Sequence, residues 1–230
     1  MLDWQPKAPY TAEQLLEILR ILRDPENGCP WDKVQTHASI RKNFLEETCE
    51  ALEAIDADDP QLMQEELGDV LMQVAFHTCM EQETGRFTWE QVCDGVCQKL
   101  IERHPNIFGT QPGYEGITDW DALKNKEKGR RTLADDLESV PRAMPALMRA
   151  AKLQKRAARH GAALQGADAA ALADAAETLQ TAQPASAQAE QAVGELLFAA
   201  ANLARQAGVD PEQALQKANE AFCTAAGPVA

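Results

Sequence analysis

Two short acidic runs in the first third of the chain contain residues that could bind a cation. The first holds Glu46, Glu47 and Glu50, and the second holds Glu66 and Asp69. Residues three apart lie on one face of an α-helix, so each run would place a pair of carboxylates side by side. Such oxygen ligands select a hard divalent cation, most simply Mg²⁺, with Mn²⁺ or Ca²⁺ as alternatives.

A turn signal separates the two runs. Asp59 is suited to cap a helix and Pro60 to begin one. The sequence therefore predicts a helix over 39–57, a tight corner, and a second helix over 60–84. Helices joined by so short a corner usually pack antiparallel. The two pairs of carboxylates are then expected to face each other across the seam.

Four converging carboxylates are unfavourable without a cation, because buried carboxylates tend to protonate. The alternative is that both runs are solvated faces of surface helices. Apolar neighbours favour the first interpretation, because they place the acids at the margin of a stripe that we expect to be buried. Gly68, inside the second helix, suggests a close helix contact. The apolar neighbours are Leu45, Leu52, Ile55, Leu67, Val70, Leu71 and Val74.

Length and charge limit the class of protein. The chain has 230 residues, 45% apolar and 25% charged, which is typical of a globular protein. A net charge of −14 argues against a nucleic acid as partner. No apolar run approaches the roughly 20 residues needed to cross a membrane. The N-terminus lacks the apolar core of a signal peptide, so we expect a cytoplasmic protein without a membrane partner.

Amphipathic periodicity continues on both sides of the acidic runs and predicts an all-α fold, a helical bundle. Thr11 caps a helix to Leu22, and a capping box at Thr88 begins another to Arg103. Lys99 and Arg103 are four apart on that helix, and His104 follows. A bridging phosphate would relieve the repulsion between the two cations. The alternative is a solvated basic helix end, where cations are favoured anyway.

Two other segments carry candidate substrate-binding residues. Trp31 lies in a turn-rich loop after the first helix, either as a core anchor or as a surface on which a base stacks. A predicted helix over 119–131 is rich in lysine and arginine, and includes Lys124 and Lys126. This basic run is either a solvated face or an arm that covers a triphosphate.

The acidic runs resemble the signature of the MazG-type all-α nucleoside triphosphate pyrophosphohydrolases, in particular of members with two tandem domains. The signature is Glu-Glu-x-x-Glu over 46–50 with Glu-x-x-Asp over 66–69. Three further stretches resemble the family, at 24–36, 99–105 and 145–150. The similarity covers most of the chain and weakens after about residue 160.

The resemblance implies an enzyme that cleaves nucleoside triphosphates between the α and β phosphates, giving a monophosphate and pyrophosphate. It implies that Glu47, Glu50, Glu66 and Asp69 hold Mg²⁺. We assign the spare carboxylate, Glu46, as the acceptor of the attacking water's proton. The residues expected to bind the substrate are Trp31, Lys99, Arg103, His104, Lys124 and Lys126.

Two other classes of protein are alternatives to this enzyme. One is a helical interaction or regulatory protein with a decayed acidic site, which the complete set of acids in the first half disfavours. The other is a carboxylate-bridged di-iron bundle, which needs Glu three residues before His on two helices. None of the four histidines has Glu at that position, so we reject the di-iron bundle.

The second half of the chain echoes the first. Segment 193–197 resembles segment 67–71, which aligns Gly194 with Gly68. In this register Ala192 replaces Glu66, and the acids that remain are Asp174, Glu177 and Glu195.

We therefore predict a MazG-like pyrophosphohydrolase domain over 1–135 and a degenerate MazG-like repeat over 136–230, which serves packing and dimerisation. A two-helix unit buries its apolar stripe only by pairing with another copy, inside the chain or across chains. From this argument and from the resemblance we expect a homodimer.

Overall fold

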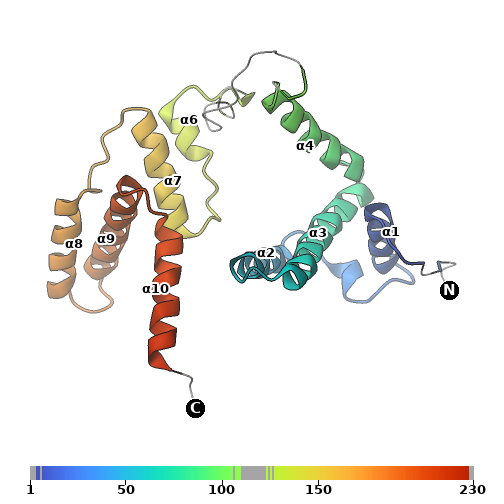
Figure 1. Ribbon diagram of the computed structural model, residues 1–230, viewed down its shortest axis with the longest axis horizontal. Coiled ribbons are helices and arrows are strands. Elements are labelled where there is room, and N and C mark those ends of the chain that lie inside the picture. The colour runs from blue at the N-terminus through green and yellow to red at the C-terminus, as the bar shows by residue number, and fades with distance from the viewer. Residues whose placement is uncertain are drawn as a thin grey trace. The chain divides into compact units, whose positions relative to one another are not determined.

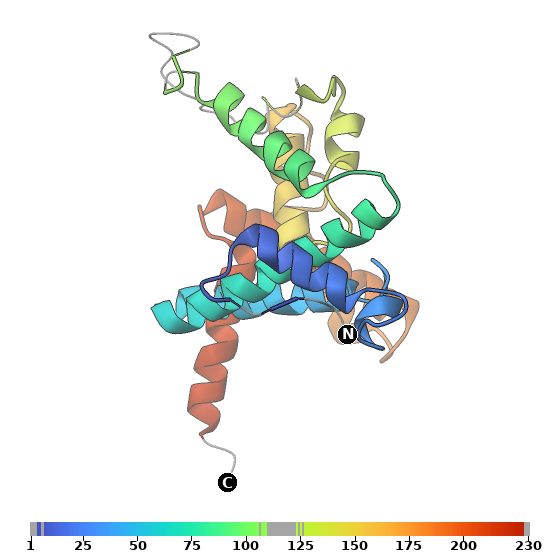
Figure 2. The ribbon, with the colours of Figure 1, turned by 90° about the vertical axis from the view of Figure 1, so that its right-hand side faces the viewer.

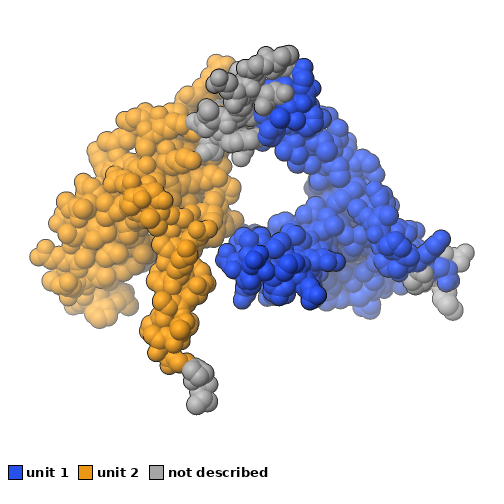
Figure 3. Space-filling view, in the orientation of Figure 1, with its two compact units in different colours: residues 1–117 blue, residues 118–230 orange. Residues whose placement is uncertain are grey.

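The regular elements of the chain are helices. The computed structural model describes residues 4–5, 7–105, 107–109, 123, 125 and 127–227, and every regular element among them is helical (Figure 1). The prediction of an all-α fold is confirmed. The chain divides into two compact units, Met1–Ile117 and Thr118–Ala230 (Figure 3). The sequence-based boundary between 135 and 136 differs from this division.

Unit 1 begins and ends its helices at the capping signals of the sequence. Thr11 and Thr88 each form a capping box, and the side chain of Asp59 accepts hydrogen bonds from two backbone N–H groups beyond Pro60. Such caps satisfy N–H groups that the helix itself leaves unpaired. The elements are α1 (Ala12–Leu22), the 3₁₀ turn η1 (Asp32–Val34), α2 (Arg41–Asp56), α3 (Pro60–Glu83) and α4 (Trp89–Arg103).

Unit 2 contains two more helices joined by a tight corner, as the repeat predicts. Its elements are α6 (Leu133–Glu138), α7 (Ala146–Arg159), α8 (Ala169–Thr181), α9 (Ala187–Gln206) and α10 (Pro211–Ala226). Of the helix predicted over 119–131, positions 119–122, 124 and 126 lie outside the described residues. Positions 123, 125 and 127 are helical, and 128–131 are not. No helix in the described part of the chain is long and apolar enough to cross a membrane.

The main core of unit 1 lies where α1 packs on the C-terminal half of α3 (Figure 2). α2 packs along α3 by its small side chains, since Ala51 and Ala54 are buried. The buried core residues are Leu16, Leu19, Ile40, Ala75, Phe76, Cys79 and Met80.

The apolar stripe beside the acids is not buried as the sequence suggested. The side chains of Leu45, Leu52, Ile55, Leu67 and Leu71 are between 40% and 57% exposed. The two valines of the predicted stripe are half-buried. These larger side chains remain exposed because α2 contacts α3 through alanines. No described element of unit 1 packs over the face on which the larger side chains lie.

The predicted close helix contact at Gly68 is also wrong for the described part of this chain. A Cβ added at Gly68 would meet nothing within 4 Å, and the same is true of its counterpart Gly194. Both glycines are exposed in the middle of their helices. Nothing within the described chain therefore requires a glycine at either position.

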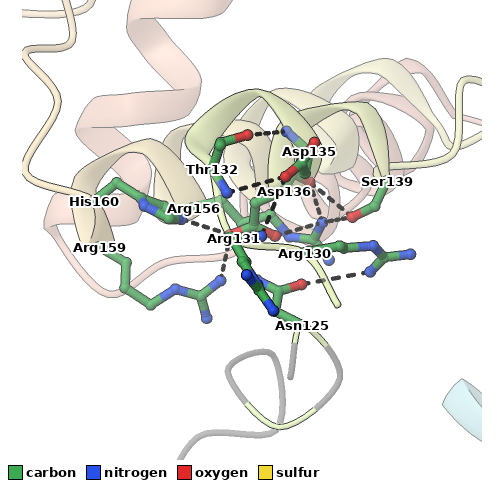
Figure 4. Close-up of polar contacts among 10 residues, drawn as sticks. All are labelled: Asn125, Arg130, Arg131, Thr132, Asp135, Asp136, Ser139, Arg156, Arg159 and His160. Atoms are coloured by element: carbon green, nitrogen blue, oxygen red, sulfur yellow. Dashed lines mark hydrogen bonds and ion pairs between the residues drawn. The ribbon is translucent and has the colours of Figure 1, made fainter. Parts of the chain in front are cut away.

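In unit 2, a buried carboxylate joins α6 to α7. The side chain of Asp136 is 1% exposed and lies 3.1 Å from Arg156, 2.6 Å from Arg159 and 3.1 Å from His160 (Figure 4). Arg156 also donates to the backbone carbonyl of Asp136 at 2.6 Å and to the hydroxyl of Ser139. The buried charge is thus paired and hydrogen-bonded, as a stable buried charge requires.

The surroundings of Asp136 keep it ionised. Burial alone would raise the pKa of Asp136. Hydrogen bonds from Asn125, Arg159 and His160, together with the positive charge of Arg156, outweigh burial, and the pKa lies below its usual value. Asp136 therefore acts as a structural anion at the junction of α6 and α7.

Candidate active site

The corner between α2 and α3 sets how the two acidic helices meet. Asp58 adopts a left-handed conformation, with a φ of 52°. Asp59 follows as the N-cap and accepts hydrogen bonds from the N–H groups of Gln61 and Leu62 at 3.0 and 3.1 Å. One left-handed residue turns the chain sharply, and the cap begins the next helix at once.

The structure brings three of the predicted metal ligands together. Ligand oxygens of Glu47, Glu66 and Asp69 all lie within 4.8 Å of one another, and the three residues are half-buried. Ala51 is buried one turn after Glu47, so no large side chain separates the acids of α2 from those of α3. The predicted juxtaposition of the two acidic runs is therefore present.

The cluster concentrates negative charge. Burial, followed by the charges of Asp69 and Glu50, raises the pKa of Glu47, and a hydrogen bond from Gln73 only partly opposes this rise. Burial and then the charges of Glu50 and Asp69 likewise raise the pKa of Glu66. Among the described residues, no lysine or arginine forms an ion pair with the cluster. Neighbouring carboxylates without a cation retain protons more readily.

The donor set fits a hard divalent cation. The three carboxylate oxygens are close enough to share one ion, and oxygen-only ligation suits Mg²⁺, Mn²⁺ or Ca²⁺ rather than a softer metal. Mg²⁺ usually takes its remaining ligands from water and substrate phosphates. A divalent cation would also offset the repulsion that adds to burial in raising the pKa of Glu47 and Glu66.

Glu50 and Glu46 complete the predicted acidic set but lie outside this group of three. Glu50 is exposed, yet its charge acts on both Glu47 and Glu66. It therefore lies close enough to act on the charge of the cluster, and its role as a metal ligand remains a prediction. Glu46 is exposed on α2, and as the spare carboxylate it remains a prediction.

Comparison with known proteins decides the family. A family model described as the MazG nucleotide pyrophosphohydrolase domain matches residues 35–108. A protein of Escherichia coli (strain K12) named nucleoside triphosphate pyrophosphohydrolase is 42% identical over 219 residues, which are 91% of this chain and 83% of the relative.

The chain belongs to the MazG family.

A second relative agrees with this assignment. A Thermotoga maritima protein, named nucleoside triphosphate pyrophosphohydrolase/pyrophosphatase MazG, is 39% identical over 218 residues, 94% of this chain and 84% of the relative. The segment that matches the MazG domain, 35–108, contains all five predicted acids. It ends before unit 2 begins, so the MazG domain match and the acidic cluster lie in the same unit.

The residues predicted to bind the substrate do not lie on α2 or α3, the two helices that carry the acids. Trp31 is 55% exposed in the loop before α2, which contradicts its interpretation as a core anchor. Lys99 is exposed and Arg103 half-buried on the last turns of α4. His104 caps this helix, and its Nδ1 lies 2.7 Å from the carbonyl of Leu100. Lys124 and Lys126 lie outside the described residues.

Sequence reasoning missed Gln73. This residue lies four positions after Asp69 on α3, is buried, and lowers the pKa of Glu47. Its Oε1 is buried without a hydrogen-bond partner in the described structure. The available signal was one polar residue, one helical turn from an acid, inside the apolar run from Val70 to Phe76. Gln73 lowers the pKa of Glu47 and so partly opposes the rise caused by burial and the neighbouring acids.

Proposed function

We propose that this chain hydrolyses nucleoside triphosphates to a nucleoside monophosphate and pyrophosphate in unit 1. The observation that carries the proposal is the cluster of Glu47, Glu66 and Asp69, three converging carboxylates without a basic partner among the described residues. The Escherichia coli and Thermotoga maritima relatives support it, since both are named nucleoside triphosphate pyrophosphohydrolases.

The acids would hold Mg²⁺, with Glu50 as a fourth ligand beside Glu47, Glu66 and Asp69. When bound, the ion would polarise the phosphoryl group and orient water. Gln73 would favour the ionised form of Glu47, because it lowers the pKa of that carboxyl group. Glu46, exposed and next to Glu47 in sequence, would accept the proton of the attacking water.

Cationic side chains would bind the polyphosphate. Lys99 and Arg103 are one helical turn apart on α4 and would neutralise the charge that develops on the phosphates. His104, Lys124 and Lys126 are further candidates for this role. Trp31, exposed in the loop before α2, would stack on the base.

The products of hydrolysis test the proposal. Common ribo- and deoxyribonucleoside triphosphates are incubated with the protein and Mg²⁺, and pyrophosphate and orthophosphate are measured separately. We expect pyrophosphate and monophosphate in equal amounts, loss of activity with excess chelator, and recovery with Mg²⁺. Orthophosphate as the first product, or turnover in excess chelator, would contradict the proposed reaction.

We also propose that the protein is a homodimer and acts in the cytoplasm, where its nucleotide substrates occur. The apolar face of Leu45, Leu52, Ile55, Leu67 and Leu71 supports dimerisation, because these side chains are at least 40% exposed and extended apolar patches usually mark an interaction surface. A second copy of the same face would cover this patch.

Light scattering tests the dimer. We expect the wild-type protein to have twice the mass of the 25.2 kDa chain, and Leu52→Asp to have the mass of one chain. Phe222→Asp is a matched control, since Phe222 is also exposed but lies on α10, outside this face. A wild-type mass of one chain would contradict the proposal.

A further inference from the structure

A line of polar side chains continues along α3 beyond the acidic cluster. Asp69, Gln73, His77 and Glu81 follow one another at intervals of four residues, so they lie along one side of the helix. Gln73 and Glu81 are buried, and His77 is half-buried. At a rise of 1.5 Å per residue, His77 lies about 12 Å along the helix from Asp69.

His77 meets a histidine from the loop before α2. The Nδ1 atoms of His37 and His77 are 2.6 Å apart, their rings are inclined by only 4°, and the ring centroids are 5.0 Å apart. Parallel rings with nitrogen atoms this close cannot be stacked face to face, so the two rings lie edge to edge in one plane. The nitrogen lone pairs then point at each other, which suits one shared proton and not a metal ion bound between them.

The carboxylate of Glu81 determines which nitrogen of His37 carries hydrogen. Nε2 of His37 lies 2.6 Å from Oε1 of Glu81, although the contact lacks the alignment of a hydrogen bond. A carboxylate held by Arg86 at 2.8 Å is ionised and would repel an unprotonated nitrogen. Nε2 therefore carries hydrogen. In the neutral pair, Nδ1 of His37 then accepts a hydrogen bond from Nδ1–H of His77.

A second anchor fixes the other end of the same loop. The guanidinium of Arg23 is paired with Glu83 of α3 at 2.5 and 2.7 Å. It also donates to the backbone carbonyls of Asp32 and Gln35 at 2.7 and 3.2 Å. Arg23 and His37 thus attach the two ends of the segment 32–37 to the C-terminal half of α3.

We propose that His37, acting through His77 and Glu81, is a positioning residue for substrate binding. The paired imidazoles hold the loop that presents Trp31 at a fixed place along α3, the helix that also carries Glu66 and Asp69. The inference rests on the proposed function, because it assigns the loop to the base of the nucleotide. His37 acts on substrate affinity and not on the chemical step.

The fold itself does not require this polar line. Aligning Gly194 with Gly68 places Ala199, Leu203 and Ala207 of α9 at the positions of Gln73, His77 and Glu81. The helix pair α8 and α9 forms without the polar line, and Ala199 is fully buried. Polar side chains at these three positions are therefore not needed for a helix pair of this kind to form.

Protonation limits the imidazole pair at low pH. When both imidazoles are neutral, or when only one is protonated, one hydrogen lies between the two Nδ1 atoms. When both imidazoles are protonated, each Nδ1 carries a hydrogen and the bond between them breaks. Burial, followed by the charge of His37, lowers the pKa of His77, and Glu81 opposes this shift. The charged groups around the pair are Glu81 and Arg86, while the neighbour from α2, Phe44, is uncharged.

The sign of the pH effect follows from the lowered pKa. Unfolded chains bind the proton of His77 more readily than the folded protein, so the pair contributes fully above the ordinary histidine pKa of about 6.5. Its contribution is lost as the pH falls from that value through the lower pKa of His77 in the folded protein. The pair thus remains formed at neutral pH and separates in acid.

Two variants of His77 test the role of the pair in the full-length protein. His77→Leu removes the donor, whereas His77→Asn keeps an N–H group near the position of Nδ1. We expect His77→Leu to raise KM about tenfold, the effect of losing one hydrogen-bonded anchor. We expect the kcat of His77→Leu to stay within about twofold of wild type. We expect both the KM and the kcat of His77→Asn to stay within the same range.

Inorganic tripolyphosphate provides the discriminating measurement, because it has no base to contact Trp31. As a competitive inhibitor it should bind the wild type, His77→Leu and His77→Asn equally well. Weaker inhibition of His77→Leu would overturn the proposal, because it would mean that the polyphosphate site itself is damaged. A fall in kcat without a rise in KM, or an equal rise in KM for His77→Asn, would also overturn it.

Fluorescence separates failure of this inference from failure of the proposed function. In a background with Trp4, Trp89 and Trp120 replaced by phenylalanine, Trp31 reports on its own loop. If the wild-type protein releases no pyrophosphate, the proposed function fails, but acrylamide quenching of Trp31 still tests the attachment. We expect greater quenching with His77→Leu and wild-type quenching with His77→Asn. Equal quenching in all three would show that the imidazole pair does not hold the loop.

Discussion

The helix pair α2 and α3 of unit 1 and the pair α8 and α9 of unit 2 share one local plan. In each corner a single non-glycine residue adopts a positive φ directly before the N-cap, Asp58 at 52° and Ala185 at 57°. In each unit an earlier helix packs on the second helix of the pair, α1 on α3 and α7 on α9. The following helix, α4 or α10, also contacts that second helix.

The two pairs differ in the side chains along the second helix. The polar residues after Asp69 on α3 are replaced on α9 by two alanines and a leucine, and Ala192 stands in place of Glu66. Both pairs nevertheless form the same helix, corner and helix. This difference teaches that such a helix pair forms without polar residues at these three positions, which fits our proposal that those of α3 serve substrate binding.

The carboxylates of the two units differ in their partners. Asp136 of unit 2 is surrounded by two arginines and a histidine, and its pKa is lowered. Glu47 and Glu66 of unit 1 have mainly other acids as charged neighbours, and their pKa values are raised. A carboxylate with built-in cations stabilises the fold, whereas clustered carboxylates without them can receive a cation from solution.

The largest effect in this comparison is expected at Asp136. Asp136→Ala leaves Arg156 buried without its anion, and breaking a buried pair in this way costs about 3–5 kcal/mol. We expect the free energy of unfolding of unit 2, measured by urea denaturation followed by circular dichroism, to fall by that amount. The folded pKa of Asp136 is lowered, so its stabilisation is present above the unfolded pKa and lost as the pH falls through the folded pKa.

Asp135 is the control, since it lies beside Asp136 but is exposed as part of a capping box. Asp135→Ala should cost about 1 kcal/mol, as expected for loss of a cap. Equal losses for the two variants would mean that burial and ion pairing at Asp136 contribute nothing beyond a helix cap.

A matched pair of acids distinguishes the units by activity. Asp69→Ala removes a carboxylate from the cluster, and a misplaced metal costs on the order of a hundredfold in rate. Glu195→Ala changes the corresponding residue of unit 2, where Ala192, three residues earlier on the same helix, already replaces the counterpart of Glu66. We expect kcat/KM to fall at least about a hundredfold for Asp69→Ala and to be unchanged for Glu195→Ala. The opposite result would place the active site in unit 2.

A smaller effect is expected from Glu47→Gln in metal-free buffer. The pKa of Glu47 is higher in the folded protein than in the unfolded chain. Ionisation of Glu47 therefore destabilises the folded protein as the pH rises through the folded pKa. Below the unfolded pKa this destabilisation is absent. Glu47→Gln should therefore melt at or slightly above the wild-type temperature at neutral pH, by less than about 1 kcal/mol at this partly exposed site. The difference from wild type should disappear in acid.

With Mg²⁺ added, the wild-type protein should melt at a higher temperature than Glu47→Gln, since only the wild type gains stability by binding the ion. A large loss of stability for Glu47→Gln without metal would show that Glu47 has a structural partner and would remove the contrast with Asp136. Thermal denaturation with and without Mg²⁺ at two pH values is sufficient for this measurement.

Local sequence signals predicted the helices of this protein well. Capping boxes at Thr11 and Thr88, and Asp59 followed by Pro60, mark helix starts as the structure has them. The convergence of Glu47 with Glu66 and Asp69 also followed from helical spacing and a short corner. These features depend on residues near one another in the sequence, where spacing alone determines geometry.

Features that depend on long-range contacts were not predictable in the same way. The exposure of Leu52 depends on what covers α2, and the pairing of His37 with His77 joins residues forty positions apart. Gln73 lay within an apparently apolar run. One sequence shows no partner for such residues, since periodicity gives the face of a helix but not the element that packs against it.

The smallest expected effect is a difference in stability between alanine variants of Gly68 and Gly194. These two glycines occupy the same register in α3 and α9. Alanine in a helix interior is favoured over glycine by about 1 kcal/mol, and neither position has a neighbour within 4 Å of an added Cβ. We expect Gly194→Ala to stabilise the protein by that amount. Gly68→Ala should stabilise it clearly less, because Gly68 borders Leu67 and Leu71, the face that we propose a second copy covers.

Urea denaturation at low and high protein concentration measures this difference. Dilution favours the separated chains by mass action, so the two variants should become alike when the dimer dissociates. Equal stabilisation by Gly68→Ala and Gly194→Ala at every concentration would show that no second copy packs against Gly68. The glycine of unit 1 would then face solvent just as its counterpart does, and the proposed dimer face would have to exclude it.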